Sequence, residues 1–414
     1  MRADHEGITV LNRRPARAAA VASLAALALL SGCTAWVPEE WREASAPPAD
    51  PTLPACVVPD GRDLAPEDGA LLGVNVEWGS QTLEDVAAAW GERPAVAVSF
   101  TDIPLDATDV ENVTAAGEQV RDGGGVLLLT LEPVGGLATV TEPVIDDLVG
   151  VLSQINATGV PVVVRFAHEM NGSWYAWGHQ PIAYVTAFRE VASAVHQGAP
   201  GSAMMWAPNS GNGYPFPEGV STAQPGTEDH AALDTDGDGE LTAADDPYAP
   251  YYPGDDVVDW VGMSMYHWGD AHPWGENEVP EDGKLVAELT GTYDGRGGDH
   301  TGVPDFHQEY GVERGKPVAV PETAALVVPG ADLTPELELE IKQAWWRQVL
   351  DPELVEQLPQ VRMINWFEWV KEEAEVGTTV DWGVTTDPAI AEAFTAELPA
   401  WAVYGEATER CAAA

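Results

Sequence analysis

The strongest constraint on the fold is a series of short apolar segments that recur between residues 71 and 369. Most of them are continuous apolar runs rather than alternating ones, which is typical of parallel strands buried on both faces of a sheet. The eight segments span residues 71–79, 95–102, 125–133, 161–169, 202–209, 257–268, 317–324 and 362–369.

Helix-compatible stretches lie between several of these runs, and each opens with a capping residue, a proline or an acid. The clearest are TLEDVAAAWG, TEPVIDDLVGVLSQIN, PIAYVTAFREVASAVHQG and TPELELEIKQAWWRQVL. Eight strands with such crossovers predict an α/β fold, a (β/α)8 TIM barrel. A doubly wound open sheet is the alternative. It would need a glycine-rich phosphate-binding turn after the first strand, and GVNVEWGS is not one.

The charge of the chain excludes some classes of partner. Among 414 residues, 67 are acidic and 19 basic, which gives a formal net charge of −48. Such a surface repels phosphate, so nucleic acid and anionic membranes are excluded as main partners. A neutral polysaccharide is not repelled, and the chain holds 16 Trp, whose indole rings are of the kind that stack on sugar faces.

The N-terminal segment predicts export. Residues 1–32 contain arginines followed by AAAVASLAALALL, which is the pattern of a signal peptide. The ending LSGC resembles a bacterial lipobox, so Cys33 is predicted to be lipidated; an uncleaved anchor or a plain signal peptide is the alternative. Arg13-Arg14 leaves a twin-arginine signal open. Residues 33–55 form a predicted Pro-rich tether, and the protein is expected outside the cytoplasm, lipid-anchored to the cell membrane or secreted.

Two further cysteines lie at the two edges of the predicted barrel domain, which spans residues 56–412. In an oxidising compartment Cys56 and Cys411 are expected to form a disulfide that ties the ends of the domain together. Two unpaired buried thiols are the alternative. No second domain or internal repeat is visible. We expect a monomer whose only membrane contact is the lipid anchor.

Polar residues follow the fourth and seventh runs, at the strand ends where barrel enzymes carry their chemistry. The segment 162–178 reads VVVRFAHEMNGSWYAWG and places Glu169 just beyond a strand, while Glu322 follows the run PVAV. Retaining glycoside hydrolysis needs two such carboxyl groups about 5–5.5 Å apart. Apolar and aromatic neighbours would raise the pKa of Glu169, as an acid requires, and Arg165 or Tyr266 would keep a nucleophile ionised.

The motif HEMNGSWYAWG, with Arg165 three residues before His168, resembles the strand-4 signature of glycoside hydrolase family 26. The resemblance extends to VDWVGMSMYHWG, PVAVPET and INWFEWVKEE, and so spans roughly residues 70–400. It implies that Glu169 is the acid/base and Glu322 the nucleophile. It also implies that substrate is bound by Arg165, His168, Trp174, Tyr266 and Trp366.

The resemblance further implies a β-linked polysaccharide as substrate and no cofactor for catalysis. We expect an endo-acting β-1,4-mannanase. The family's mannanases carry a His after strand 3, whereas this chain reads TLEP with Glu132, which is similar to the family's mixed-linkage β-1,3-1,4-glucanases. That glucanase activity is one alternative, and a non-catalytic carbohydrate-binding lipoprotein is another. A purely structural barrel would leave the polar strand ends unexplained.

Residues 234–245 read DTDGDGELTAAD and resemble an EF-hand calcium loop. Oxygen ligands at loop positions 1, 3, 5, 7 and 12 surround one cation, and a glycine at position 6 makes the turn. The predicted structural Ca²⁺ ligands are Asp234, Asp236, Asp238, Glu240 through its carbonyl, and Asp245. The alternative is a solvated acidic loop.

Overall fold

The computed structural model describes residues 57–216 and 219–406. Cys33, Cys56 and Cys411 lie outside the described residues, as do the predicted signal peptide and tether, so lipidation and the disulfide stay predictions. Within the two described ranges, no helix combines the length and apolarity that a membrane span requires.

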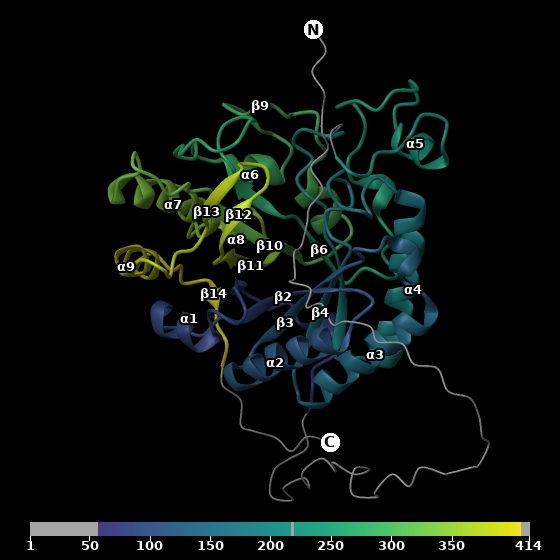
Figure 1. Ribbon diagram of the computed structural model, residues 1–414, viewed down its shortest axis with the longest axis horizontal. Helices are drawn as coiled ribbons and strands as arrows, with labels where there is room; N and C mark the ends of the chain where they lie inside the picture. Colours follow the sequence, from purple (N-terminus) through teal and green to yellow (C-terminus); the bar gives the residue numbers. More distant parts are fainter. Residues whose placement is uncertain (1–56, 217–218, 407–414) are drawn as a thin grey trace, which may run out of the picture. The chain divides into compact units, whose positions relative to one another are not determined.

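A closed parallel β-barrel forms the centre of the described domain, which confirms the predicted fold (Figure 1). Neighbouring strands pair in the order of the chain, and β10 closes the barrel by pairing with β11. The barrel strands are β1 (Ala70–Asn75), β2 (Val96–Asp102), β3 (Val126–Glu132), β4 (Val162–Phe166), β5 (Ser202–Trp206), β6 (Trp260–Gly262), β10 (Val318–Ala325) and β11 (Val361–Phe367). The predicted sixth strand is interrupted, because β7 (Met265–His267) follows β6 and pairs separately with β10.

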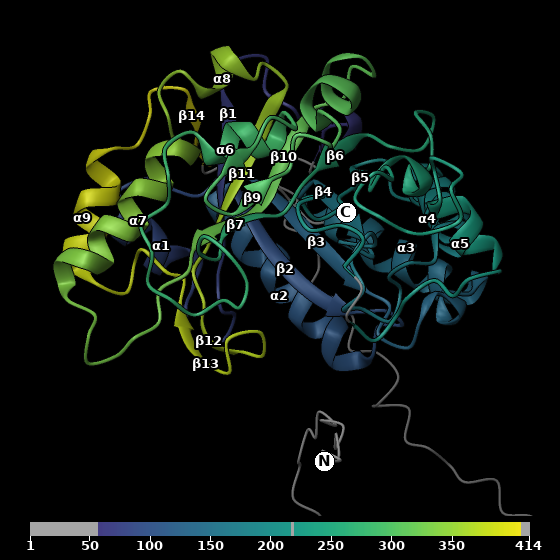
Figure 2. The same cartoon turned by 90° about the horizontal axis from the view of Figure 1, so that it is seen from above.

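Helices lie outside the strands, and Figure 2 shows α7 and α9 on one side of the barrel with α3 and α4 on the other. Among the described residues, six helices have eight or more residues: α1 (Leu83–Trp90), α2 (Ala107–Gly123), α3 (Glu142–Ala157), α4 (Pro181–Gly198), α7 (Pro335–Val349) and α9 (Pro388–Ala396). Their starts carry the expected signals, with capping boxes at Thr82 and Asp106 and an early proline in the last four.

Shorter elements decorate the loops. They are α5 (Glu228–Leu233), α6 (Lys284–Leu289), α8 (Leu354–Gln357), the 3-10 turns Gly61–Asp63, Leu137–Thr139 and Ala249–Tyr251, the π-helix His307–Val312, and the strands β8 (Asp294–Gly295), β9 (Gly298–Asp299), β12 (Val370–Glu373), β13 (Thr378–Asp381) and β14 (Ala402–Val403). The hairpin β12–β13 follows β11, and β14 pairs with β1.

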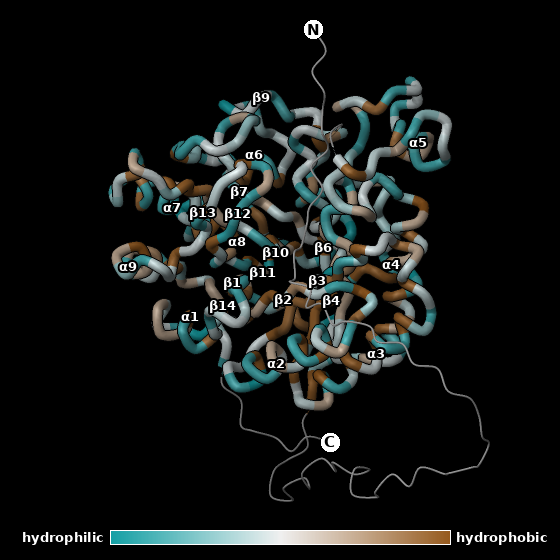
Figure 3. Tube along the Cα trace, in the orientation of Figure 1, coloured by the Kyte–Doolittle hydropathy of each residue, from teal (hydrophilic) through white to brown (hydrophobic). Residues whose placement is uncertain are grey.

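Successive side chains of each strand point to opposite faces, so the apolar core has two separate parts. One set of side chains fills the barrel, including Val98, Leu128, Val163 and Met363, and the other set packs beneath the helices. Figure 3 shows hydrophobic residues along β2, β3 and β4 in the interior. Both faces of a strand are therefore apolar, which is the reason for the continuous runs in the sequence. Near the carboxyl ends the inward positions become polar, as at Asn75, Thr130 and Arg165.

Candidate active site

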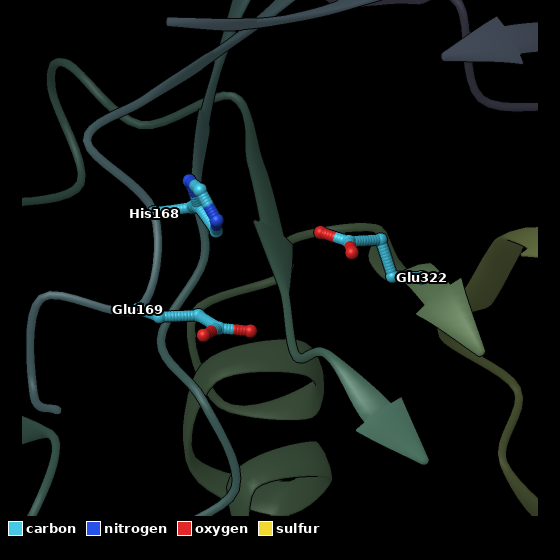
Figure 4. A group of neighbouring side chains, drawn as sticks. All are labelled: His168, Glu169 and Glu322. Atoms are coloured by element: carbon cyan, nitrogen blue, oxygen red, sulfur yellow. The ribbon is translucent and has the colours of Figure 1, made fainter. Parts of the chain in front are cut away.

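Two glutamates face one another at the carboxyl ends of the barrel strands. Carboxylate oxygens of Glu169 and Glu322 and a ring nitrogen of His168 all lie within 4.8 Å of one another. Figure 4 shows the two carboxyl groups pointing toward each other, with His168 beside them. Glu169 is 8% exposed and Glu322 7% exposed. This spacing leaves room for one anomeric carbon between them and suits a retaining mechanism.

Glu322 lies within β10 and is held by two donors. Arg165 Nη1 donates to Glu322 Oε1, and the Tyr266 hydroxyl donates to Glu322 Oε2 at 2.8 Å. The second guanidinium nitrogen, Arg165 Nη2, donates to Ser264 Oγ at 2.6 Å. Arg165 is fully buried, so its charge is offset largely by this one carboxylate. The two donors therefore fix the orientation of the Glu322 carboxylate.

Glu169 follows β4 at a sharp turn of the backbone. Ala167 and Glu169 have φ angles of 46° and 53°, in the left-handed region that residues other than glycine rarely adopt. Trp174 Nε1 donates to Glu169 Oε2 at 3.0 Å. Burial raises the pKa of Glu169, the charge of Glu322 adds to that rise, and Arg165 opposes it. A carboxyl group in this environment is suited to keep a proton and to donate it.

His168 is a neutral group beside the carboxyl pair. Its side chain is buried, and burial together with the charge of Arg165 lowers its pKa well below the usual value. Its ring lies 5.0 Å from that of Tyr175, which stacks on Trp177 at 4.3 Å. Trp177 Nε1 donates to the His168 carbonyl at 2.7 Å and fixes the turn. His168 can therefore hydrogen-bond to a sugar without adding charge.

The prediction that Trp366 lines the sugar subsite is wrong. Strand alternation turns Met363 and Asn365 into the barrel, so Trp366 points outward. Its ring is 1% exposed and lies 5.7 Å from Phe394 of α9. Trp369, with its partly exposed ring 6.5 Å from Phe100, lies at the barrel mouth instead. Counting the alternation along INWFEW would have distinguished the two indoles.

Sequence reasoning assigned no role to two hydrogen-bonding residues of the site. Ser264 lies in the break between β6 and β7 and bridges to Asn209 beyond β5. Side-chain hydrogen bonds from Ser264 and Asn209 to Glu169 oppose the rise in its pKa. Ser264 also contacts Arg165, so it links the two carboxyl environments. A lone serine in an apolar run carries no signal that would have pointed to it.

A third carboxyl group, Glu132, lies at the end of β3. It pairs in register with Asp102 of β2, and Thr130 two residues earlier pairs with Arg165. Burial raises the pKa of Glu132 to about 7, with further contributions from the charges of Glu322, Asp102 and Glu169. The mouth of the barrel therefore holds a third carboxyl group, Glu132, in addition to the two catalytic candidates.

The acidic loop gathers part of the predicted calcium ligand set. Carboxylate oxygens of Asp234, Asp236 and Asp245 lie within 4.8 Å of one another. Asp234 Oδ1 is buried and has no hydrogen-bond partner among the described residues, as a metal ligand would require. Asp245 is 2% exposed but accepts from the backbone of Thr235 and Thr242. Asp238 and Glu240 are exposed, and their carboxylates are not part of this group.

Part of the sequence resembles a known enzyme family. The model of glycosyl hydrolase family 26 matches residues 132–227, which include β4, Glu169 and the turn that follows. The match covers this segment, and Glu322 lies outside the matched residues. Endoglucanase H of Acetivibrio thermocellus is 24% identical over 177 residues, which are 41% of this chain and 17% of the relative. The chain thus matches only a small part of that curated relative.

Solved structures resemble the barrel over most of its length. A modular endo-β-1,4-mannanase from Cellulomonas fimi superimposes with a TM-score of 0.52 at 17% identity, covering 87% of this chain and 80% of that one. A double mutant of a Cellulomonas fimi endo-β-1,4-mannanase gives 0.51 at 16% identity, covering 81% and 72%. At this identity the likeness establishes the shared fold.

Proposed function

We propose that this chain is a retaining, endo-acting β-glycoside hydrolase. The observation that carries the proposal is the pair of buried carboxyl groups, with oxygens within 4.8 Å, in two different environments. Glu322 receives hydrogen bonds from Arg165 and Tyr266, which suits an ionised nucleophile. Burial and a neighbouring negative charge favour the protonated form of Glu169. Such a division of roles is what a two-step displacement needs.

In the first step a Glu322 oxygen forms a bond to the anomeric carbon while the glycosidic C–O bond breaks. Glu169 gives its proton to the departing oxygen, and a covalent glycosyl-enzyme results. In the second step Glu169, now ionised, takes a proton from water as that water attacks the same carbon. The Glu322 ester bond breaks, and the sugar leaves with its original configuration. Trp174, which donates to Glu169, would hold the acid in place during both transfers.

For the substrate we propose a β-1,4-linked mannan. The support is the resemblance of the strand-4 motif to family mannanases and the fold shared with an endo-β-1,4-mannanase from Cellulomonas fimi. Mixed-linkage β-glucan is the second candidate, since Glu132 stands where the mannanases carry a His and the curated relative is an endoglucanase by name.

A turnover panel tests the substrate. We expect kcat/KM to be highest on mannan among mannan, glucomannan, mixed-linkage β-glucan and xylan, with the reducing sugar first released as the β-anomer. Mixed-linkage glucan ahead by tenfold, about 1.4 kcal/mol in transition-state binding, would overturn the mannan assignment and leave the retaining mechanism standing. Binding of a glycan with no turnover on any of the four would favour the non-catalytic alternative.

We also propose that the acidic loop binds a structural Ca²⁺ through Asp234, Asp236 and Asp245. Chelation is expected to lower the melting temperature, and free Ca²⁺ at 100 times its dissociation constant would stabilise the fold by about 2.7 kcal/mol. In Asp234→Ala the chelator should have no effect, whereas Glu228→Ala, which removes an exposed acid of α5 outside the loop, should respond like the natural chain. A wild-type melting temperature indifferent to chelator would remove the metal from the proposal.

A further inference from the structure

The tyrosine that donates to the nucleophile is itself supported by a buried indole. The Trp382 ring lies 5.1 Å from the Tyr266 ring at an interplanar angle of 61°. Trp382 is 1% exposed and also meets Trp268 edge-on at 4.9 Å. Phe367 contacts the Tyr266 ring from 5.9 Å. The position of the Tyr266 hydroxyl over Glu322 therefore depends on where these two rings are held.

The segment that carries Trp382 is anchored by a buried lysine. Lys342 of α7 is 0% exposed, and its ammonium donates to the Gly383 carbonyl at 2.6 Å. The same nitrogen lies 3.0 Å from Glu338 Oε1 and 3.3 Å from Asp381 Oδ1. A buried ammonium is tolerated only when its donors are satisfied, so the contacts with Asp381 and Gly383 tie the residues on either side of Trp382 to α7, and Glu338 of the same helix completes the pairing of the ammonium.

A buried glutamate anchors the same segment from its other side. Glu368, just after β11, accepts on Oε2 from the backbone nitrogens of Val384 and Thr385, each at 3.1 Å, and from Thr385 Oγ1 at 2.7 Å. Between the two anchors, Trp366 Nε1 donates to the Trp382 carbonyl at 3.1 Å. The indole wrongly predicted to contact sugar thus belongs to this support.

The Trp382 side chain has one polar atom, and it is paired as well. Trp382 Nε1 donates to Glu373 Oε1 of β12 at 2.8 Å, and the Trp382 backbone nitrogen donates to the Trp369 carbonyl at 3.0 Å. The ring is therefore fixed at its edge, at its backbone and on both flanks. A network in which every buried polar group of this residue is bonded leaves little freedom for the indole to rotate.

We propose that Trp382 is a positioning residue, held by Lys342 and Glu368, that acts through Tyr266 on the nucleophile Glu322. Its indole nitrogen donates to Glu373 and so acts on neither carboxyl group of the pair by a hydrogen bond. It keeps the Tyr266 hydroxyl aimed at Glu322 Oε2 while the charge on that carboxylate changes during the reaction. The proposal rests on the function proposed above, because it takes Glu322 as the nucleophile.

The test is a double-mutant cycle between Trp382→Ala and Tyr266→Phe. Each single variant is expected to lower kcat by about 10- to 100-fold, because a hydrogen bond to a charged group is lost or misaligned, while KM changes less than about threefold. The double variant should fall within about twofold of Tyr266→Phe alone, because Trp382 acts only through that hydroxyl. Trp382→Phe, which keeps a flat ring against Tyr266, should recover most of kcat.

Two further measurements separate positioning from loss of structure. Trp401→Ala removes a partly buried indole that donates to the Asp351 carbonyl, and should leave kcat unchanged within about twofold. Lys342→Met keeps the aliphatic stem without the ammonium and should lower kcat about as much as Trp382→Ala does. When Tyr266→Phe is already present, Lys342→Met should lower kcat no further. Losses that multiply fully in the double variant, or a control as impaired as Trp382→Ala, would overturn the proposal.

A crystal structure of Trp382→Ala makes the test independent of activity. We expect the Tyr266 ring to rotate and its hydroxyl to leave hydrogen-bond distance of Glu322. A hydroxyl that stays at its position in the intact protein, 2.8 Å from Oε2, would refute the positioning role. A wild-type protein that hydrolyses no β-glycan would refute the proposed function instead, and the crystal structure would still decide whether Trp382 positions Tyr266.

Discussion

Replacing Glu322 with alanine is expected to lower kcat on the best polysaccharide by roughly 10⁴-fold or more. The variant cannot form the covalent intermediate, and no other described carboxyl group receives hydrogen bonds from both Arg165 and Tyr266. The measurement is kcat together with the melting temperature, so that a folded but inactive protein is distinguished from an unfolded one. A suitable control is Glu288→Ala, which removes a carboxyl group of the same 7% exposure from α6, outside the barrel.

Chemical rescue by azide tests whether Glu322 is the nucleophile. In Glu322→Ala an azide ion fits the space of the lost carboxylate, forms a C–N bond to the anomeric carbon, and displaces an activated leaving group. The product should be a glycosyl azide of inverted configuration, because a single displacement replaces the usual two. Near-full activity of Glu322→Ala, or an azide product of retained configuration, would show that Glu322 is not the nucleophile.

Replacing Glu169 with alanine is expected to lower kcat/KM on polysaccharide by about 10²- to 10⁴-fold. The loss should depend on the leaving group, since a sugar oxygen needs a proton to depart whereas 2,4-dinitrophenolate does not. With such an aryl glycoside the first step should stay fast and the second should slow. Azide should then give a glycosyl azide of retained configuration. Equal losses on both substrates would contradict the acid/base role.

The pH dependence offers a second test of Glu169. Burial and the charge of Glu322 raise the pKa of Glu169, so the acid holds its proton to higher pH than an ordinary glutamate. The alkaline limb of kcat/KM on polysaccharide should therefore mark the loss of that proton, with activity falling as pH rises. This limb should be absent for the dinitrophenyl glycoside with Glu169→Ala. Glu132 titrates nearby, with its pKa raised to about 7, so Glu132→Gln is the matched control for the limb.

Much of the fold could be predicted from the sequence because barrel strands are buried on both faces. The continuous apolar runs at residues 125–133, 161–169 and 317–324 coincide with β3, β4 and β10. The first residues after or at the end of these runs had to be at the mouth, so Glu169 and Glu322 were found as candidates without coordinates. Arg165 and Tyr266 were likewise predicted beside Glu322, and both donate to it.

Only the tertiary structure decided how these groups are arranged. The separation of two carboxyl groups 153 positions apart in the chain follows from barrel closure and from the left-handed turn at Ala167 and Glu169, which no local pattern encodes. Other features of the site also depend on partners far away in sequence. Trp366 packs outward against Phe394, Ser264 contacts Arg165, and Lys342 anchors the segment of Trp382. Local apolar patterning specifies which segments become strands, whereas side-chain contacts between distant strands and helices specify the chemistry of the site.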